Sequence, residues 1–271
     1  MKILISQMKP YLGDVEKNLE KILRDGEEGV KENCDVAVFP ELSLTGTLLE
    51  DGVFQVALSE IPEKLLELSR KITLIFGGVL KENKKFYNCG YCLEDGEILA
   101  EHKKVFLSNR FGGSESRSFS RGKEIKSFKS RHGVFGITLG EEGLNPMVNG
   151  ILSQDGAEII FNLVNESLPA EDEVSIYEAA AKASSVYNKN FTLTVNRVGT
   201  EDGVVFTGSS FAVSPYGKII EKTEKFAEKF AEKLSIINID LKDIDKAKYN
   251  SCLDNENNLE VIKKEIERIM K

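Results

Sequence analysis

Residues 135–146 read FGITLGEEGLNP, and this stretch points to the fold because it changes character twice within a short span. Its first residues are apolar or small, as in a buried strand, a glycine and two glutamates follow as a turn, and Pro146 stands where a helix would begin. Enzymes use such a strand-turn-helix elbow to expose a nucleophile at its tip. Here the tip is Gly140, which has no side chain and equally suits a plain turn with positive φ.

Strand and helix patterns alternate along most of the chain, which is typical of an α/β protein. Strands are expected at KILIS (2–6), DVAVFPE (35–41), ITLIFGGVL (72–80), AEIIFNLV (157–164), NFTLTVN (190–196), GSSFAVS (208–214), GKIIEK (217–222) and LSIINIDL (234–241). Helices are expected after Asp14, between Pro62 and Arg70, over 147–156 with Gly156 as its stop, and over 171–190. Residues 85–100 predict a hairpin that turns at Glu94-Asp95-Gly96.

The composition is that of a globular protein, with 41% hydrophobic and 30% charged residues among 271. The net charge of -8 argues against a nucleic-acid partner, because affinity for phosphates comes chiefly from Lys and Arg. No window approaches the roughly 20 apolar residues of a membrane span. We therefore expect a soluble protein with no nucleic-acid and no membrane partner.

The cysteines give no sign of a disulfide framework. There are four, Cys34, Cys89, Cys92 and Cys252, and this low number favours a reducing cytoplasm. Cys89 and Cys92 have Cys-x-x-Cys spacing, but they lie in a strand pattern without a second pair, and the chain has only two histidines. We expect no metal and no cofactor.

The C-terminal part reads as an extension rather than a second domain. Leu259, Ile262, Ile266 and Ile269 form an apolar stripe on a final helix, which suits core packing or a dimer contact. The charged run 221–233 is typical of a solvated face around Phe226 and Phe230. Without a Pro/Gly/Ser linker or a break in composition, we predict one domain over residues 1–245 and a helical extension over 246–271.

Two other stretches hold residues suited to chemistry. In FPELSLTG (39–46), Glu41 follows an apolar strand that proline ends, where α/β proteins place reactive groups. Beside apolar walls its pKa would rise and it could act as a general base, although a solvated strand-end glutamate is the alternative. In EHKKVFLSN (101–109), Lys103 and Lys104 adjoin an apolar run, so a buried lysine could stabilise an oxyanion, with an exposed turn as the alternative.

Taken in order, these stretches resemble the nitrilase superfamily of carbon-nitrogen hydrolases, and most of all the glutaminase domain of glutamine-dependent NAD synthetase. The matching motifs are VAVFPELSLTG (36–46), YNCGYCLEDGEILAEHKKVFLSN (87–109), NRFGGSESRSF (109–119), FGITLGEEGLNP (135–146) and VNRVGTEDGVVFTGSSF (195–211). The similarity runs from the first strand to LSIINIDL. It implies a single-domain, four-layer α/β/β/α sandwich that forms a homodimer or a larger homo-oligomer.

The resemblance also implies a mechanism and a set of site residues. In the family a cysteine attacks an amide carbon to form a thioester, a glutamate moves protons, and a lysine holds the oxyanion. Matched onto this chain, Glu41 would be the base, Lys104 the oxyanion partner and Glu115 a supporting acid. The position of the thiol falls on Gly140.

A glycine cannot attack an amide, and none of the four cysteines lies in a matching motif. Thr138 is the nearest hydroxyl along the chain, but it lies two residues back within the strand. Because loss of a covalent nucleophile usually costs many powers of ten in rate, we expect a catalytically impaired protein. It would act as a binding or regulatory subunit, with a small amide or carboxylate ligand near Glu41 and Lys104.

Two further expectations follow from the resemblance. A separate chain of the synthetase type is a candidate partner for such a subunit. The alternative to an impaired protein is an active amidase or glutaminase that uses a non-standard nucleophile or a water molecule activated by Glu41.

Overall fold

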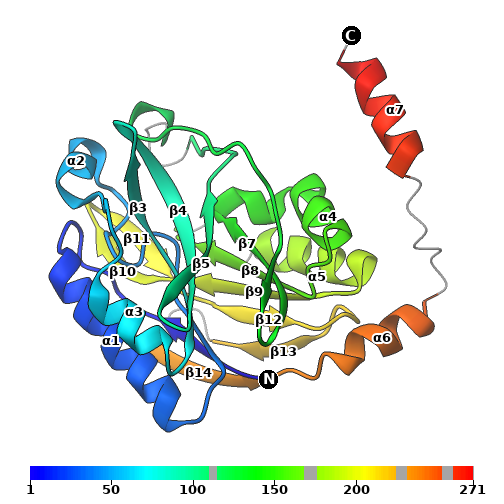
Figure 1. Cartoon of the computed structure of the whole chain (residues 1–271), viewed down its shortest axis with the longest axis horizontal. Helices are drawn as coiled ribbons and strands as arrows, with labels where there is room; N and C mark the ends of the chain where they lie inside the picture. Colours follow the sequence, from blue (N-terminus) through cyan, green and yellow to red (C-terminus); the bar gives the residue numbers. More distant parts are fainter. Residues whose placement is uncertain (110–114, 168–175, 224–230, 252–258, 271) are drawn as a thin grey trace.

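Two six-stranded sheets lie face to face, and helices cover their outer faces (Figure 1). This structure is a computed structural model, and it describes residues 1–109, 115–167, 176–223, 231–251 and 259–270. The layers run helix, sheet, sheet, helix, so the expected four-layer α/β/β/α sandwich is confirmed.

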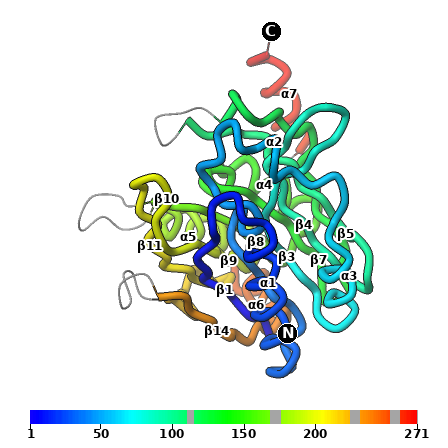
Figure 2. Tube along the Cα trace, turned by 90° about the vertical axis from the view of Figure 1, so that its left-hand side faces the viewer, coloured from blue at the N-terminus to red at the C-terminus, as the bar shows by residue number. Residues whose placement is uncertain are grey.

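The first sheet has the strand order β14-β1-β2-β3-β4-β5. Its strands are β1 (Lys2–Gln7), β2 (Val36–Val38), β3 (Thr73–Glu82), β4 (Lys85–Glu94), β5 (Glu97–Lys103) and β14 (Lys233–Asn238). β1, β2 and β3 are parallel. β14 pairs antiparallel with β1, so the first and the last strand of the chain lie side by side (Figure 2). Helices α1 (Val15–Lys31) and α3 (Glu63–Ser69) cover the outer face.

The second sheet has the order β13-β12-β9-β8-β7-β6. Its strands are β6 (Phe128–Ser130), β7 (Gly133–Leu139), β8 (Ile159–Val164), β9 (Phe191–Asn196), β12 (Phe211–Val213) and β13 (Ile219–Lys222). β7, β8 and β9 are parallel. Helices α4 (Pro146–Gln154) and α5 (Ile176–Asn188) cover this sheet.

The strands are apolar on both faces because each sheet is covered on both sides. Successive side chains point to opposite faces of a strand. In β1, Ile3 and Ile5 therefore enter the core between the sheets, while Leu4 packs toward α1 and α3. Phe135 and Ile137 of β7 meet them from the second sheet.

The local signals for turns and helix ends are largely confirmed. Asp14 caps α1, its side chain accepting a hydrogen bond from the Lys17 N–H at 3.1 Å. Asp95 and Gly96 both have positive φ, as a two-residue hairpin turn requires. Gly156, with φ of 100°, follows the end of α4.

Several short elements were not expected from the sequence. They are the 3-10 turns Glu50–Gly52, Glu115–Arg117 and Gly140–Leu144, the single helical turn α2 (Val53–Val56), and the hairpin of β10 (Val198–Glu201) and β11 (Val204–Thr207). All are too short to give a clear periodic pattern.

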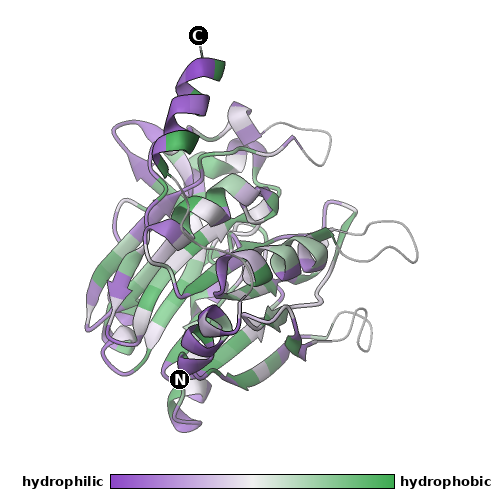
Figure 3. Cartoon of the chain, turned by 90° about the vertical axis from the view of Figure 1, so that its right-hand side faces the viewer, coloured by the Kyte–Doolittle hydropathy of each residue, from purple (hydrophilic) through white to green (hydrophobic). Residues whose placement is uncertain are grey.

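Two helices follow the last strand. In α6 (Lys242–Tyr249), Ile244 and Ala247 are buried, and the expected boundary at residue 245 falls inside this helix. α7 (Leu259–Ile269) carries both apolar and polar residues (Figure 3), but none of them is buried. Core packing of its stripe is therefore not found within the described residues, and a dimer contact stays a prediction. Phe226, Phe230 and Cys252 lie outside the described residues.

The Cys89 and Cys92 pair cannot form a joint site. Residues three apart on a strand point to opposite faces, so Cys89 packs toward the outer helices and Cys92 between the sheets. Burial raises the pKa of both thiols well above the usual range. Across the described parts of the chain, no set of three or more His, Cys, Asp or Glu side chains is arranged to hold a metal ion.

Candidate active site

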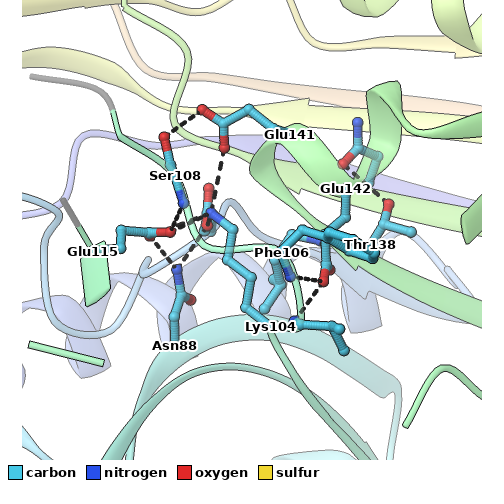
Figure 4. Close-up of polar contacts among 12 residues, drawn as sticks. Asn88, Lys104, Phe106, Ser108, Glu115, Thr138, Glu141 and Glu142 are labelled. Carbon is cyan, nitrogen blue, oxygen red and sulfur yellow. Dashed lines mark hydrogen bonds and ion pairs between the residues drawn. The ribbon is translucent and has the colours of Figure 1, made fainter. Parts of the chain in front are cut away.

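Three segments meet at the seam between the two sheets, and Figure 4 shows the polar contacts around Lys104 there. Glu41 follows β2, Lys104 follows β5, and Gly140 follows β7. The first two belong to one sheet and the third to the other. The site is therefore assembled from both sheets.

Glu41 owes its position to a close approach of two backbones. Its loop follows β2, which ends at Val38, and it lies directly against Gly77 of β3. A Cβ at Gly77 would lie 2.3 Å from the Leu42 nitrogen and 2.9 Å from the carbonyl carbon of Glu41. Only glycine leaves room for this contact, which holds Glu41 fully buried.

Lys104 lies at the centre of a group of three carboxylates. Its Nζ is 2.9 Å from Glu41 Oε1, 3.0 Å from Glu115 Oε2 and 3.4 Å from Glu141 Oε2. The structure thus brings together Glu41, Lys104 and Glu115, the residues that the resemblance names, and their catalytic role stays a prediction. Glu141 was not singled out, although its place next to Gly140 was the available signal.

Two polar residues complete this group. The Asn88 Nδ2 donates to Glu41 Oε1 at 2.8 Å and to Glu115 Oε1 at 3.0 Å. Ser108 donates its hydroxyl to Glu141 Oε1 at 2.7 Å and its backbone N–H to Glu115 Oε2 at 2.7 Å. Each carboxylate of the group therefore has a second donor besides Lys104.

The charges shift the pKa of both central groups. Burial raises the pKa of Glu41 to about 7; attraction to Lys104 opposes this, while repulsion from Glu115 and Glu141 adds to it. Burial alone would lower the pKa of Lys104, but its attraction to the three carboxylates outweighs burial and holds the pKa above its usual range. Lys104 is thus charged at neutral pH, whereas Glu41 is poised between its two forms.

Gly140 faces this group directly. Its φ is +52°, in the left-handed region that favours glycine. A Cβ built on it would lie 2.8 Å from Lys104 Nζ, 3.0 Å from Glu41 Oε2 and 3.3 Å from Glu41 Oε1. Any side chain at this position would start between the base and the ammonium, where a nucleophile would be needed.

Thr138 does not replace the missing nucleophile. Its hydroxyl is buried and donates to Asn162 Oδ1 at 3.1 Å. Its neighbours Ile137 and Leu139 face the core between the sheets, so Thr138 points to the opposite face of β7. The three described cysteines are all buried in the apolar cores, Cys34 and Cys89 beneath the outer helices and Cys92 between the sheets.

Glu142 is a further site residue that the sequence did not reveal. It is fully buried, and its Oε2 lies 2.7 Å from His102 Nε2 and accepts the Leu139 N–H at 3.0 Å. Its Oε1 accepts the Val105 N–H at 2.6 Å. Burial alone would raise the pKa of Glu142, but His102 and the backbone N–H groups hold it below its usual range. Glu142 thus ties the segment of Lys104 to the strand end of Gly140.

A second buried ion pair supports the loop beyond Glu41. Arg197 contacts Glu201, donates to Thr47 Oγ1 at 2.9 Å and lies over the Phe206 ring. Glu201 Oε2 accepts the Thr47 N–H at 2.9 Å. The unexpected β10–β11 hairpin therefore fixes one wall of the space next to the site.

That space is a cavity of about 410 Å³ that opens from the Lys104 group toward solvent. Lys104, Ser108 and Glu115 line its inner end, and Glu50, Asp51 and Arg117 belong to its exposed rim. The other lining residues are Thr47, Leu48, Leu49, Val53, Ser118, Phe119 and Asn165. The cavity is large enough for an amino-acid-sized molecule.

The chain matches a model of the carbon-nitrogen hydrolase family over residues 2–249. A glutamine-dependent NAD(+) synthetase from Aquifex aeolicus is 31% identical over 236 residues, covering 84% of this chain and 41% of that protein. A probable nitrilase from Schizosaccharomyces pombe is 28% identical over 234 residues, covering 82% of this chain and 84% of that protein. The chain therefore spans about two fifths of the synthetase but most of the nitrilase.

Solved structures show the same fold. An amidase from Nesterenkonia sp. AN1, in a form that carries acrylamide on its active-site cysteine, superposes with a TM-score of 0.81 at 18% identity, covering 97% of this chain and 99% of that one. A glutamine-dependent NAD+ synthetase from Acinetobacter baumannii gives 0.75 at 23% identity, covering 87% and 44%. No helix in the described ranges is long and apolar enough to cross a membrane.

Proposed function

Because the chain belongs to the carbon-nitrogen hydrolase family, within the nitrilase superfamily and related to the glutaminase domain of NAD synthetase, we propose that it binds a small amide-like ligand without forming a thioester. It would act as a binding or regulatory subunit rather than as an amidase. Glu41, Lys104 and Glu115 would form the ligand-binding end of the cavity, and Gly140 would stand where the family's route needs a thiol.

One observation carries this proposal: a Cβ at Gly140 would lie within about 3 Å of both Lys104 Nζ and Glu41 Oε2. The position is the one from which a nucleophile would reach an amide carbon held between base and ammonium. Gly140 offers no atom that can form the bond. A carboxylate ligand suits the site less well than an amide, because three carboxylates already surround Lys104.

The relatives suggest how such a subunit would be used. In the synthetases, a region that this chain does not span makes up more than half of the protein. We propose a separate chain of the synthetase type as a partner, and a homodimer or larger homo-oligomer in the cytoplasm as the assembly. Size-exclusion chromatography with light scattering would test the assembly, and a monomer would contradict it.

Glutamine hydrolysis tests the missing catalysis. We expect the purified protein to release ammonia from glutamine or acetamide at no more than the rate of a Glu41→Gln variant, because the family's nucleophile is absent. The matched control is Glu27→Gln, which makes the same change on the exposed surface of α1. Turnover that Glu41→Gln abolishes and Glu27→Gln preserves would refute the proposal.

One observation favours the alternative of direct water attack. Glu41 Oε2 has no hydrogen-bond partner among the described residues, and the pKa of about 7 leaves this carboxylate able to exchange a proton near neutrality. Glu41 would take a proton from water as the hydroxide adds to the amide carbon, and would return it to the departing nitrogen. This route predicts hydrolysis that rises with pH through about 7 and disappears in Glu41→Gln.

A further inference from the structure

The inner end of the cavity has its hydrogen-bond donors already engaged. An ammonium has three N–H donors, and Lys104 Nζ has three carboxylates within reach. Both N–H donors of the Asn88 amide go to Glu41 and Glu115. Ser108 gives its hydroxyl to Glu141 and its backbone N–H to Glu115. A ligand that needs donors finds them already in use here.

Acceptors, by contrast, are in surplus. Glu41 Oε2 and Asn88 Oδ1 are buried and have no hydrogen-bond partner among the described residues. Glu41 Oε2 points toward Gly140, since a Cβ built on Gly140 would lie 3.0 Å from it. Leaving such acceptors buried and unpaired costs free energy, which a donor from a ligand would recover.

The charges around Lys104 also favour a ligand that brings N–H donors, provided that it is positively charged. Three carboxylates surround a single ammonium, so the group has two excess negative charges when all its members are ionised. The exposed rim does not reverse this, because Arg117 is accompanied there by Glu50 and Asp51. The low-polarity surroundings of a buried group strengthen this attraction for a cation.

We infer that this site takes a small organic cation that carries N–H donors, an amidinium or a primary ammonium, in preference to a neutral amide or a carboxylate. At the inner end of the cavity, N–H groups of the ligand would donate to the carboxylates around Lys104, with Glu41 Oε2 as the acceptor that is still unpaired. The inference rests on the proposed binding function and specifies the charge of the ligand. A glycine suits position 140 because of its positive φ and because a Cβ there would lie 2.8 Å from Lys104 Nζ.

A series of molecules of equal shape tests the inference. Acetamidinium, acetamide and acetate differ in charge but little in size. We would titrate each into the full-length protein at pH 8 and constant ionic strength, and measure dissociation constants by ligand-observed NMR. Acetamidinium is expected to bind about tenfold or more tightly than acetamide, with acetate weakest, because a charge-assisted hydrogen bond is replaced by a neutral one and then by a repulsion.

Two controls distinguish the effect of N–H donors from that of charge, and binding at the site from binding elsewhere on the surface. Tetramethylammonium has the charge without N–H donors, and it should bind at least about tenfold more weakly than acetamidinium. Glu41→Gln should weaken acetamidinium by about tenfold or more, whereas Glu27→Gln on α1 should leave it unchanged.

The possible failures are distinguishable. Acetamide or acetate binding as tightly as acetamidinium would overturn the inference and leave the proposed binding function standing. The inference would also be overturned if tetramethylammonium bound as tightly as acetamidinium, because N–H donors would then not matter. Equal losses of acetamidinium affinity in Glu41→Gln and Glu27→Gln would overturn it too, because binding would then not depend on the site. No binding by any probe would remove the proposed function together with the inference.

Discussion

Glu41 should make the stability of the protein depend on pH in an unusual direction. The pKa of this carboxyl is raised from 4.5 to about 7 in the folded protein, because burial disfavours its charge. A raised pKa gives stability that is fully present below the unfolded value and is lost as the pH rises through the folded value. The free energy of unfolding should therefore fall between about pH 4.5 and pH 7.

The size of the effect follows from the pKa difference. One pKa unit corresponds to 1.36 kcal/mol, so the shift of Glu41 sets an upper value of about 3 kcal/mol. Lys104 does not contribute in this window, because its raised pKa lies above the usual value and it stays charged in both states. Glu142, whose pKa is lowered, contributes a loss of stability only as the pH falls below about 4.5.

Glu41→Gln isolates the effect. Glutamine keeps an oxygen for the Lys104 and Asn88 donors but cannot ionise. The unfolding free energy of the variant should therefore show no fall from this position between about pH 4.5 and pH 7. Urea unfolding at half-unit steps from pH 4.5 to 8.5 would give the difference between the two proteins, which should grow by about 3 kcal/mol toward high pH. Parallel profiles would refute the reasoning, because Glu41 would then ionise alike in the folded and unfolded states.

Two further substitutions test the site's construction by urea unfolding. Gly140→Ala should destabilise the protein by about 1–3 kcal/mol, because of its positive φ and the contact with Lys104, whereas Gly52→Ala, where φ is −61° and a Cβ meets nothing within 4 Å, should change stability by under about 0.5 kcal/mol. Equal effects would contradict the strained position of Gly140. Glu142→Gln should cost about 3 kcal/mol by breaking its pairing with His102, against about 0.5 kcal/mol or less for Glu265→Gln in the exposed pair with Arg268. A similarly small loss of stability in both variants would show that Glu142 does not hold the Lys104 segment against the end of β7.

The features that the sequence revealed depend on local patterns. The strands were recognisable from their alternation and apolar runs, and the Asp95-Gly96 turn from residues that tolerate positive φ. The grouping of Glu41, Lys104 and Glu115 was predicted through the resemblance, since nothing in their spacing requires them to meet. Their placement as catalytic residues stays a prediction, although their contacts are now described.

The features that the sequence did not reveal depend on contacts between distant segments. Arg197 donates to Thr47, which lies 150 positions away in the sequence, and no periodic pattern predicts that contact. Nothing in the sequence singled out His102, because its partner Glu142 is supplied by the other sheet. Thr138 was the nearest hydroxyl in sequence, but the alternation of β7 turns it away from the site.

The origin of the site in two sheets has a consequence for cooperativity. Neither sheet alone can present Glu41, Lys104 and Gly140 to one another, so a molecule that binds at the Lys104 end of the cavity binds only the fully docked sandwich. Its binding energy therefore adds to the unfolding free energy of both sheets together. Backbone amides of β3 and β8, on opposite sides of the seam, should then gain protection from hydrogen exchange in equal measure when the site is saturated.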